Sequence, residues 1–357
     1  MSSITLKTIY YYPVFWTGYA WFRLTGRTPK SAYRSLRRLY SATHGAFNRK
    51  VSKRLARGSK TPAVQPVSGL LGSGDELAGA LERALGDLRR DGFHVFKQRM
   101  PAEQVEALVR FAKEAECRLI PAPSTGPARA RFDPAAPKAP RYQVDEEALV
   151  SAEGVQRFMA DETLIRLAER YLEAPPINDL TAMWWSAPAD AASRSAAAQL
   201  FHFDMDRLRF IKYFVYLTDV GPHNGPHVVV RGSHEKRPAA FYKDRRFSDE
   251  EVNAAFPGDE VRSLVGPAGT VLAVDTSSLH KGQPLETDHR LLLQVEYTNS
   301  LFGQTYTRVN SGPQPGGPLA HAVQKHPHVF QRFSGSRMRK HPVGDSNPCY
   351  RDENPAS

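Results

Sequence analysis

The sequence predicts an α+β protein with a jelly-roll core, in which two antiparallel sheets face each other and helices cover one side. Apolar residues recur at helical spacing between residues 77 and 117. The segments after residue 180 are mostly short strands separated by turns rich in Gly, Pro and Asn. Helices followed by strands are typical of a buttressed double sheet, so we expect about eight core strands behind N-terminal helices.

The elements expected before the metal-binding region follow from local patterns. Leucines at helical spacing predict the first helix, Asp91-Gly92 ends it, and Pro101 opens the next helix. In order, we expect a helix over 77–88, a strand over 93–96, a helix from 101, helices over 146–149 and 155–172, and a strand over 180–185.

Length and composition bound the class of protein. The 357 residues suit one large domain or two modest ones, and a hydrophobic fraction of 41% is ordinary for a globular chain. No apolar run reaches the roughly 18–20 residues that span a bilayer. Only Cys117 and Cys349 are present, which excludes a disulfide framework and a clustered thiolate metal site. With no recognisable secretion signal, these features favour the cytoplasm.

The net charge of +11 is concentrated at the N-terminus. Residues 1–74 contain 13 Lys and Arg and no Asp or Glu, which leaves 35 basic and 37 acidic side chains in the rest of the chain. The basic charge therefore concerns a partner of the N-terminal segment and not the substrate pocket.

Residues 1–60 form an aromatic and basic segment with two open interpretations. Residues 9–24 are rich in Tyr, Trp and Phe, and residues 31–57 form a basic, helix-like stretch. Such a segment suits a peripheral contact with a membrane or an acidic partner. Alternatively, the aromatic residues pack on the main domain and the basic residues form a solvated face. Nucleic acid is disfavoured because no recognition motif accompanies the charge.

Three further segments complete the expected organisation. Residues 61–75 are a linker, 76–310 are the main domain, and 311–357 are an irregular C-terminal tail rich in Pro, Gly, His and Arg. Inside the main domain, residues 121–141 contain six prolines, and a long irregular loop of this kind favours a lid beside a pocket.

A His-x-Asp pair marks the candidate site. In an extended chain, alternate side chains share a face, so His202 and Asp204 point the same way and together can bind one metal ion. A clear strand over 269–275 leads to His280, which is placed to turn back onto that ion. Ten residues later, Arg290 opens a further strand.

This ordered set resembles the phytanoyl-CoA dioxygenase family of iron(II)- and 2-oxoglutarate-dependent dioxygenases. The resemblance covers roughly residues 76–300 and also rests on Phe210 to Val220, on Asn224-Gly225-Pro226-His227 and on Gly232-Ser233-His234. It implies a double-stranded β-helix, the jelly roll of cupin-like proteins. One departure from the family pattern is Arg231, at the position where a proline often precedes Gly-Ser-His.

The resemblance also implies the cofactors and the reaction. His202, Asp204 and His280 would bind Fe(II), and Arg290 would bind the far carboxylate of 2-oxoglutarate, for which a bidentate guanidinium is well suited. O2 is the second cosubstrate, and succinate and CO2 are released. Related halogenases have a small residue at the carboxylate position, so Asp204 favours hydroxylation.

Three other residues are weaker candidates. Lys212 shares the face of His202 and Asp204 if the alternation continues, and a buried lysine needs an anionic partner. That partner could be the cosubstrate, the substrate or Glu296. Alternatively, Lys212 is exposed to solvent. Tyr142 and Trp185 are candidates for the wall of the substrate pocket, against the alternative that they pack in the core.

The preferred function is hydroxylation of a small organic or lipid-like molecule. One alternative is a non-catalytic jelly-roll protein that its basic N-terminus recruits to a membrane or acidic partner. Another is an oxygenase of protein or nucleic acid, although the near-neutral main domain disfavours nucleic acid. The sequence identifies neither the substrate, since one fold hosts many, nor the oligomeric state.

Overall fold

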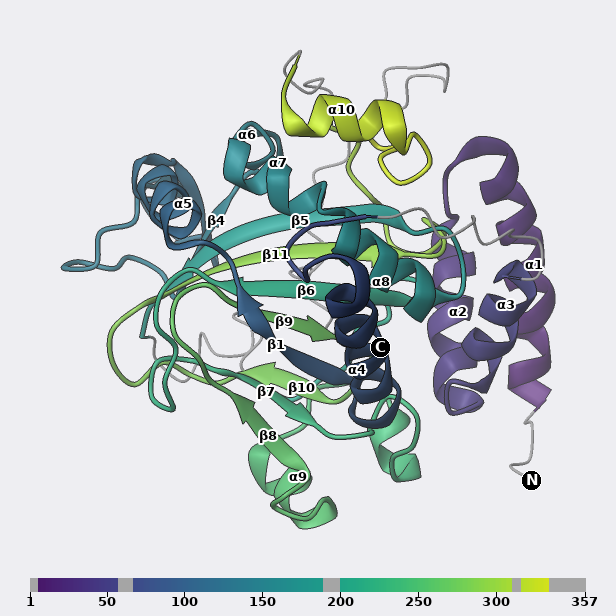
Figure 1. Cartoon of the computed structure of the whole chain (residues 1–357). Helices are drawn as coiled ribbons and strands as arrows, with labels where there is room; N and C mark the ends of the chain where they lie inside the picture. The colour runs from purple at the N-terminus through teal and green to yellow at the C-terminus, as the bar shows by residue number, and fades with distance from the viewer. Residues whose placement is uncertain (1–5, 57–66, 189–199, 310–315, 334–357) are drawn as a thin grey trace.

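The computed structural model describes residues 6–56, 67–188, 200–309 and 316–333 (Figure 1). Its helices are α1 (Leu6–Thr25), α2 (Lys30–Ala42), α3 (Ala46–Ala56), α4 (Gly74–Asp91), α5 (Ala102–Glu114), α6 (Glu146–Leu149), α7 (Glu153–Met159), α8 (Glu162–Leu172), the 3-10 helix η2 (Ala239–Tyr242), α9 (Asp249–Ala255) and α10 (Pro318–Lys325). Its strands are β1 (Phe93–Arg99), β2 (Cys117–Ile120), β3 (Arg129–Ala130), β4 (Arg141–Val144), β5 (Ile177–Ser186), β6 (Phe210–Tyr216), β7 (His227–Val230), β8 (Val261–Leu264), β9 (Thr270–Val274), β10 (His280–Gly282) and β11 (Arg290–Thr298).

Two antiparallel sheets form a jelly roll. The large sheet has the strand order β1-β9-β6-β11-β5-β4-β2-β3, and the small sheet has the order β10-β7-β8. An isolated antiparallel bridge between His202 and His280 adds one more extended segment to the edge of the small sheet. This segment and strands β5 to β11 give the eight-stranded core expected from the sequence, and the predicted double-stranded β-helix is confirmed.

The two faces of the large sheet have different neighbours. Ile211, Tyr213 and Val215 of β6 belong to a core shared with α4, α5 and α8. Phe214 and Tyr216 belong to a smaller cluster between the sheets, with apolar residues of β7 and β8. Figure 1 shows α5, α6 and α7 on one side of the large sheet and the small sheet on the other. Strand alternation therefore divides the interior into a helix-covered core and a space between the sheets.

Helix α4 shows how the sequence determines one of these elements. The leucines that predicted it are buried against the sheet. The helix ends where Gly92 adopts a left-handed conformation, with φ of 85°. A Cβ atom at this position would lie 2.5 Å from Ser278 Oγ and 2.8 Å from His234 Nδ1. Glycine is therefore required both for the backbone angle and for the close approach to the neighbouring loops.

Helices α1, α2 and α3 pack against the jelly roll. Phe15 of α1 and Phe302, which follows β11, are both fully buried, with ring centroids 5.2 Å apart. Arg37 of α2 donates from Nε and Nη2 to the two carboxylate oxygens of Asp244, each at 2.7 Å. Part of the aromatic segment thus packs on the main domain, as one of the two interpretations expects. None of the described helices is long and apolar enough to cross a bilayer.

Two other expected segments have more structure than the sequence indicated. Residues 318–325 of the expected irregular tail form α10, and Leu319 and Phe330 are buried in the helix-covered core. The proline-rich loop contains the short strand β3, and most of its side chains are exposed. The first part of the expected linker and residues 334–357 lie outside the described residues.

Replacement of Phe302 by Ala should destabilise the contact between the N-terminal helices and the jelly roll. A fully buried phenylalanine removed from a packed cluster costs about 3–5 kcal/mol, so the free energy of unfolding in urea should fall by that order. Tyr10→Ala is the control, because this side chain is 66% exposed and its loss should change stability by less than about 0.5 kcal/mol. Equal stability of the two variants would contradict the packing.

Candidate metal centre

His202, Asp204 and His280 come together at one end of the space between the sheets. One nitrogen or oxygen atom from each lies within 4.8 Å of the others. The backbone fixes this arrangement. The His202 amide donates to the His280 carbonyl at 2.9 Å, the His280 amide donates back at 2.8 Å, and the Asp204 amide donates to the Thr276 carbonyl at 2.8 Å. Two chain segments far apart in the sequence are therefore held in register.

Both imidazoles present the same nitrogen to the cluster. Nδ1 of His202 donates to the Leu200 carbonyl at 2.8 Å, and Nδ1 of His280 donates to the Ser278 carbonyl at 3.0 Å. A carbonyl only accepts, so these bonds fix the tautomer and leave Nε2 of each ring as a ligand atom. Each Nε2 lies 3.7 Å from one oxygen of Asp204. Burial lowers the pKa of both histidines, which keeps the rings neutral.

Asp204 supplies the negative charge of the cluster. Burial alone would raise the pKa of its carboxyl, but Lys212 and the two histidines outweigh that effect, and the net pKa is lowered. Two neutral imidazoles and one carboxylate form the donor set of a ferrous ion that keeps coordination positions open for other ligands. The residues present therefore fit the iron that the sequence resemblance implies.

Lys212 is buried beside Asp204. Its Nζ lies 2.8 Å from Asp204 Oδ2, 3.3 Å from Glu296 Oε2 and 3.6 Å from Asp206 Oδ2, and the side chain is only 2% exposed. The exposed position is therefore excluded, and Glu296 is one of its partners. Burial raises the pKa of Asp206 to about 6, despite Lys212, and raises that of Glu296 well above its ordinary value. A direct contact between Lys212 and 2-oxoglutarate stays a prediction.

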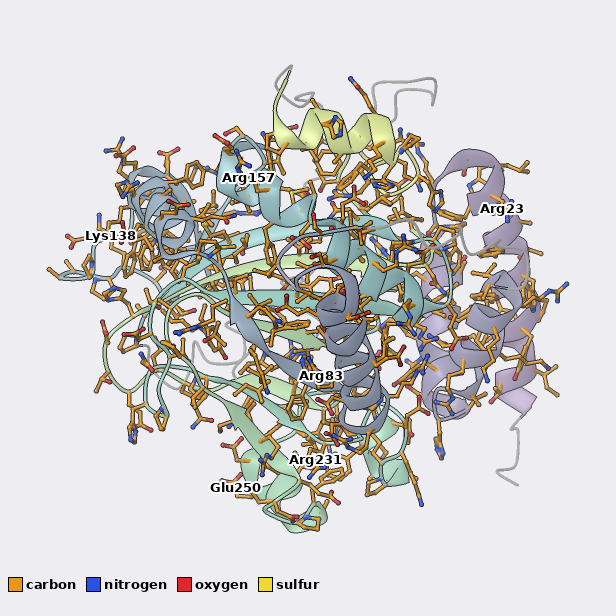
Figure 2. All side chains as sticks on the ribbon, viewed as in Figure 1. Arg23, Arg83, Lys138, Arg157, Arg231 and Glu250 are labelled. Atoms are coloured by element: carbon orange, nitrogen blue, oxygen red, sulfur yellow. The ribbon has the colours of Figure 1, made fainter. Side chains whose placement is uncertain are left out.

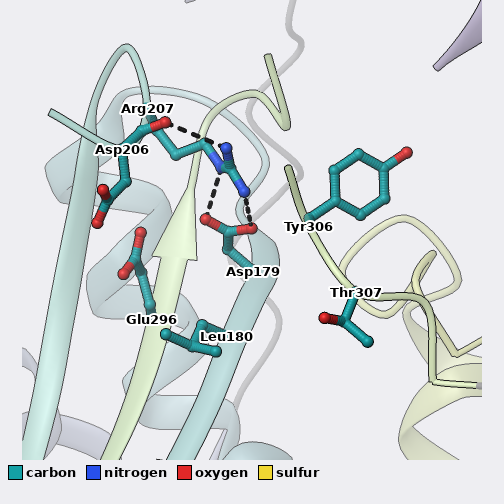
Figure 3. Close-up of a pocket in the computed structure, with 7 residues that line it drawn as sticks. All are labelled: Asp179, Leu180, Asp206, Arg207, Glu296, Tyr306 and Thr307. Atoms are coloured by element: carbon teal, nitrogen blue, oxygen red, sulfur yellow. Dashed lines mark hydrogen bonds and ion pairs between the residues drawn. The ribbon is translucent and has the colours of Figure 1, made fainter. Parts of the chain in front are cut away.

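An ion pair that the sequence did not reveal borders this cluster. Arg207 donates from Nε and Nη2 to the two carboxylate oxygens of Asp179, at 2.6 and 2.7 Å (Figure 3). Figure 3 also shows the carboxyl groups of Asp206 and Glu296 pointing toward one another next to this pair. Because Asp179 lies on β5 and Arg207 precedes β6, no local pattern connects them.

Arg290 and His227 lie farther along the space between the sheets. Arg290 is buried at the start of β11, on the face that Glu296 shares, and donates to the Gly225 carbonyl and to Ser186 Oγ. The His227 ring stacks on His280, with centroids 5.3 Å apart, and its Nε2 is buried without a hydrogen-bond partner among the described residues. His227 ends the Asn-Gly-Pro-His segment on which the resemblance partly rests, but no local pattern predicts a role for it.

The structure separates Tyr142 and Trp185 from the metal ligands. Both side chains belong to the helix-covered core, where the Trp185 ring stacks on Phe132 with centroids 4.6 Å apart. The adjacent Trp184 instead lies in the cluster between the sheets. The expected pocket-wall position of Tyr142 and Trp185 is thus replaced by core packing, because alternation along β5 turns Trp185 away from the metal ligands.

The chain is similar to several solved structures, all at low identity. EctD from S. alaskensis in its apoform shares 20% identity, with 72% of this chain and 92% of that chain covered and a TM-score of 0.47. HygX from Streptomyces hygroscopicus with nickel and 2-oxoglutarate bound shares 17%, covering 62% and 88%, with a TM-score of 0.44. AviO1 from Streptomyces viridochromogenes shares 20%, covering 61% and 94%, with a TM-score of 0.43. A search of curated proteins returns no significant match.

A family model gives the decisive comparison. The model of phytanoyl-CoA dioxygenase matches residues 88–291, which is more than half of the chain and includes both histidines and the aspartate of the cluster. The match begins near the end of α4 and ends at the start of β11, so it covers the core strands from β5 to β10 and only the first residues of β11. The chain therefore belongs to the phytanoyl-CoA dioxygenase family, and it is an iron(II)- and 2-oxoglutarate-dependent dioxygenase.

Proposed function

We propose that this enzyme hydroxylates a small organic or lipid-like molecule and releases succinate and CO2. The observation that carries the proposal is the convergence of His202 Nε2, His280 Nε2 and the ionised Asp204 within 4.8 Å. Iron bound by these atoms would supply oxygen activation coupled to the decarboxylation of 2-oxoglutarate. The carboxylate of Asp204 favours hydroxylation over halogenation.

The surrounding residues have separate tasks in this proposal. Arg290 binds the far carboxylate of 2-oxoglutarate, because its guanidinium is buried on the sheet face that leads to the metal ligands. His227 lies against His280 and keeps the ring in position, and its Nε2, which has no partner in the described part of the chain, is available for a hydrogen bond with the cosubstrate. The apolar side chains between the sheets exclude water from the reaction.

Replacement of His280 by Ala should abolish both metal binding and turnover. Loss of one of three protein ligands should weaken Fe(II) binding by more than roughly 100-fold, as measured by anaerobic titration, and succinate formation should fall to background. His223→Ala is the control, since this histidine is exposed and pairs with Glu286 at the surface. Wild-type protein that binds no iron would instead favour the non-catalytic jelly-roll alternative.

Replacement of Arg290 by Gln should weaken the binding of 2-oxoglutarate and leave the binding of the metal intact. Loss of a charge-assisted pair should raise the Kd for 2-oxoglutarate roughly 10- to 100-fold, followed through the charge-transfer absorbance of the anaerobic iron complex. Arg290→Lys should recover part of the affinity, and Arg262→Gln, at an exposed position of β8, should not change it. An unchanged Kd for 2-oxoglutarate in Arg290→Gln would indicate that another residue binds the far carboxylate of the cosubstrate.

We propose in addition that the enzyme is cytoplasmic and binds the surface of an anionic membrane through α1. Five of the seven large hydrophobic side chains that are exposed in the described residues lie on this helix, at helical spacing: Ile9, Tyr10, Trp16, Trp21 and Leu24. Arg23 lies on α1 at the edge of the molecule (Figure 2), and the Arg54 guanidinium of α3 lies 5.5 Å from the Trp16 ring. Exposed aromatic residues flanked by basic side chains suit a lipid interface.

Substitution of Trp21 and Leu24 by Ser should reduce membrane binding. We expect sedimentation with vesicles containing 30% phosphatidylserine to fall about fivefold or more, because the apolar contact and not the charge is removed. Val95→Ser with Val265→Ser is the matched control, as these exposed residues lie on the main domain. The proposal would be contradicted if the α1 variant sedimented with the vesicles as well as the wild type does, or if the wild type did not sediment with them.

A further inference from the structure

A cavity of about 380 Å³ lies between the N-terminal helices and the jelly roll. Its walls come from α2 and α3 on one side and from the chain between Asp204 and Phe210 on the other, with contributions from α4, α8 and the loop before β10. The volume is within the range of roughly 300–1,000 Å³ that is usual for small-molecule sites. Asp204 is part of the wall, so the cavity reaches the candidate metal centre.

The charges around the cavity are not balanced. Arg49, Lys53 and Arg89 line it, and none of them forms an ion pair with a carboxylate of the described residues. Glu235, which is exposed, and the buried Asp275, which accepts a hydrogen bond from the Tyr171 hydroxyl at 2.5 Å, are the lining acids without a cationic partner among the described residues. The other lining acids have cationic partners: Asp204 lies 2.8 Å from Lys212, and Glu173 lies 3.9 Å from Arg209. The three unpaired cations therefore outnumber the two acids that lack a cationic partner. The cavity therefore has an excess of positive charge at its mouth.

Two buried polar groups of α3 also lack partners. Asn48 and Ser52, residues only 6% and 3% exposed, line the cavity, and the buried atoms Asn48 Oδ1 and Ser52 Oγ form no hydrogen bond with any described residue. They are four residues apart and so lie on one face of the helix, next to Arg49 and Lys53. An acceptor left unsatisfied at this depth costs about 1–3 kcal/mol unless a ligand or water donates to it.

We infer that this cavity binds a small hydroxyl-bearing molecule with one anionic group, either a phosphate or a carboxylate. The anion pairs with Arg49, Lys53 and Arg89 at the mouth, and a hydroxyl donates to Asn48 Oδ1. Met205, Leu208 and Phe210 supply the apolar part of the wall. The inference does not depend on the proposed oxygenase reaction, because the binding groups are separate from the iron ligands and Arg290.

Calorimetric titration of the full-length protein tests the inference with three probes. Glycerol 3-phosphate should bind, and glycerol, which lacks the anion, should bind at least tenfold more weakly. Dihexanoyl phosphatidic acid, used below its micelle concentration, separates a lipid head group from a free phosphate ester. Tighter binding of the lipid would identify the lipid as the source of the anion, and tighter binding of the free ester would exclude it.

Variants of α3 locate the binding. Lys53→Gln combined with Arg49→Gln should weaken the binding of glycerol 3-phosphate at least tenfold. Asn48→Leu should also weaken the binding of glycerol 3-phosphate, but it should leave the binding of inorganic phosphate unchanged. Lys50→Gln is the matched control, because it removes a charge from the same helix outside the cavity. Equal weakening by Lys50→Gln, or no binding of any anionic probe, would overturn the inference. If the protein still binds iron in that case, the proposed oxygenase function is unaffected.

Discussion

The pair of backbone hydrogen bonds between His202 and His280 is the constraint on which the rest of the site depends. It joins a segment before β6 to the first residue of β10, and both imidazoles then project from one bridge. Because backbone groups form this bridge, the geometry of the ligands does not depend on a bound ion. The third ligand follows two residues later, where the Asp204 amide donates to the carbonyl of Thr276, two residues after the end of β9.

Several charged groups lie in the interior close to the same bridge. Asp179, Asp204, Asp206 and Glu296 lie together with only Lys212 and Arg207 as close cationic partners among the described residues. Buried carboxylates are tolerated when paired or neutral, and the pKa of Glu296, which burial raises well above its ordinary value, indicates that a proton neutralises this carboxyl. A divalent cation bound to Asp204 would supply more positive charge, so the electrostatics of the protein and the proposed iron are complementary.

Local pattern and chain order predicted much of the fold and the set of candidate ligands. The leucines of α4 and the turns after residue 180 carry their signal within a few residues, and so does the His-x-Asp pair. The partners of Lys212 and the pair Arg207–Asp179 depend on which strands are neighbours, which no local pattern states. Trp184 and Trp185 are a second example of what the sequence cannot predict. Adjacent residues of a strand face opposite sides of the sheet, but the sequence does not determine which of the two tryptophans faces the ligands. The cavity beside α3 was likewise not predictable, because its walls come from distant segments.

The contact between Phe15 and Phe302 also has a consequence for how the chain folds. The two rings are far apart in the sequence and Phe302 follows the last core strand, so this contact cannot form until β11 has been made. Contacts of such long sequence separation form late, since the loop between them must first be closed. We therefore expect the docking of α1 on the jelly roll to be completed late in folding, when the core strands are already in place.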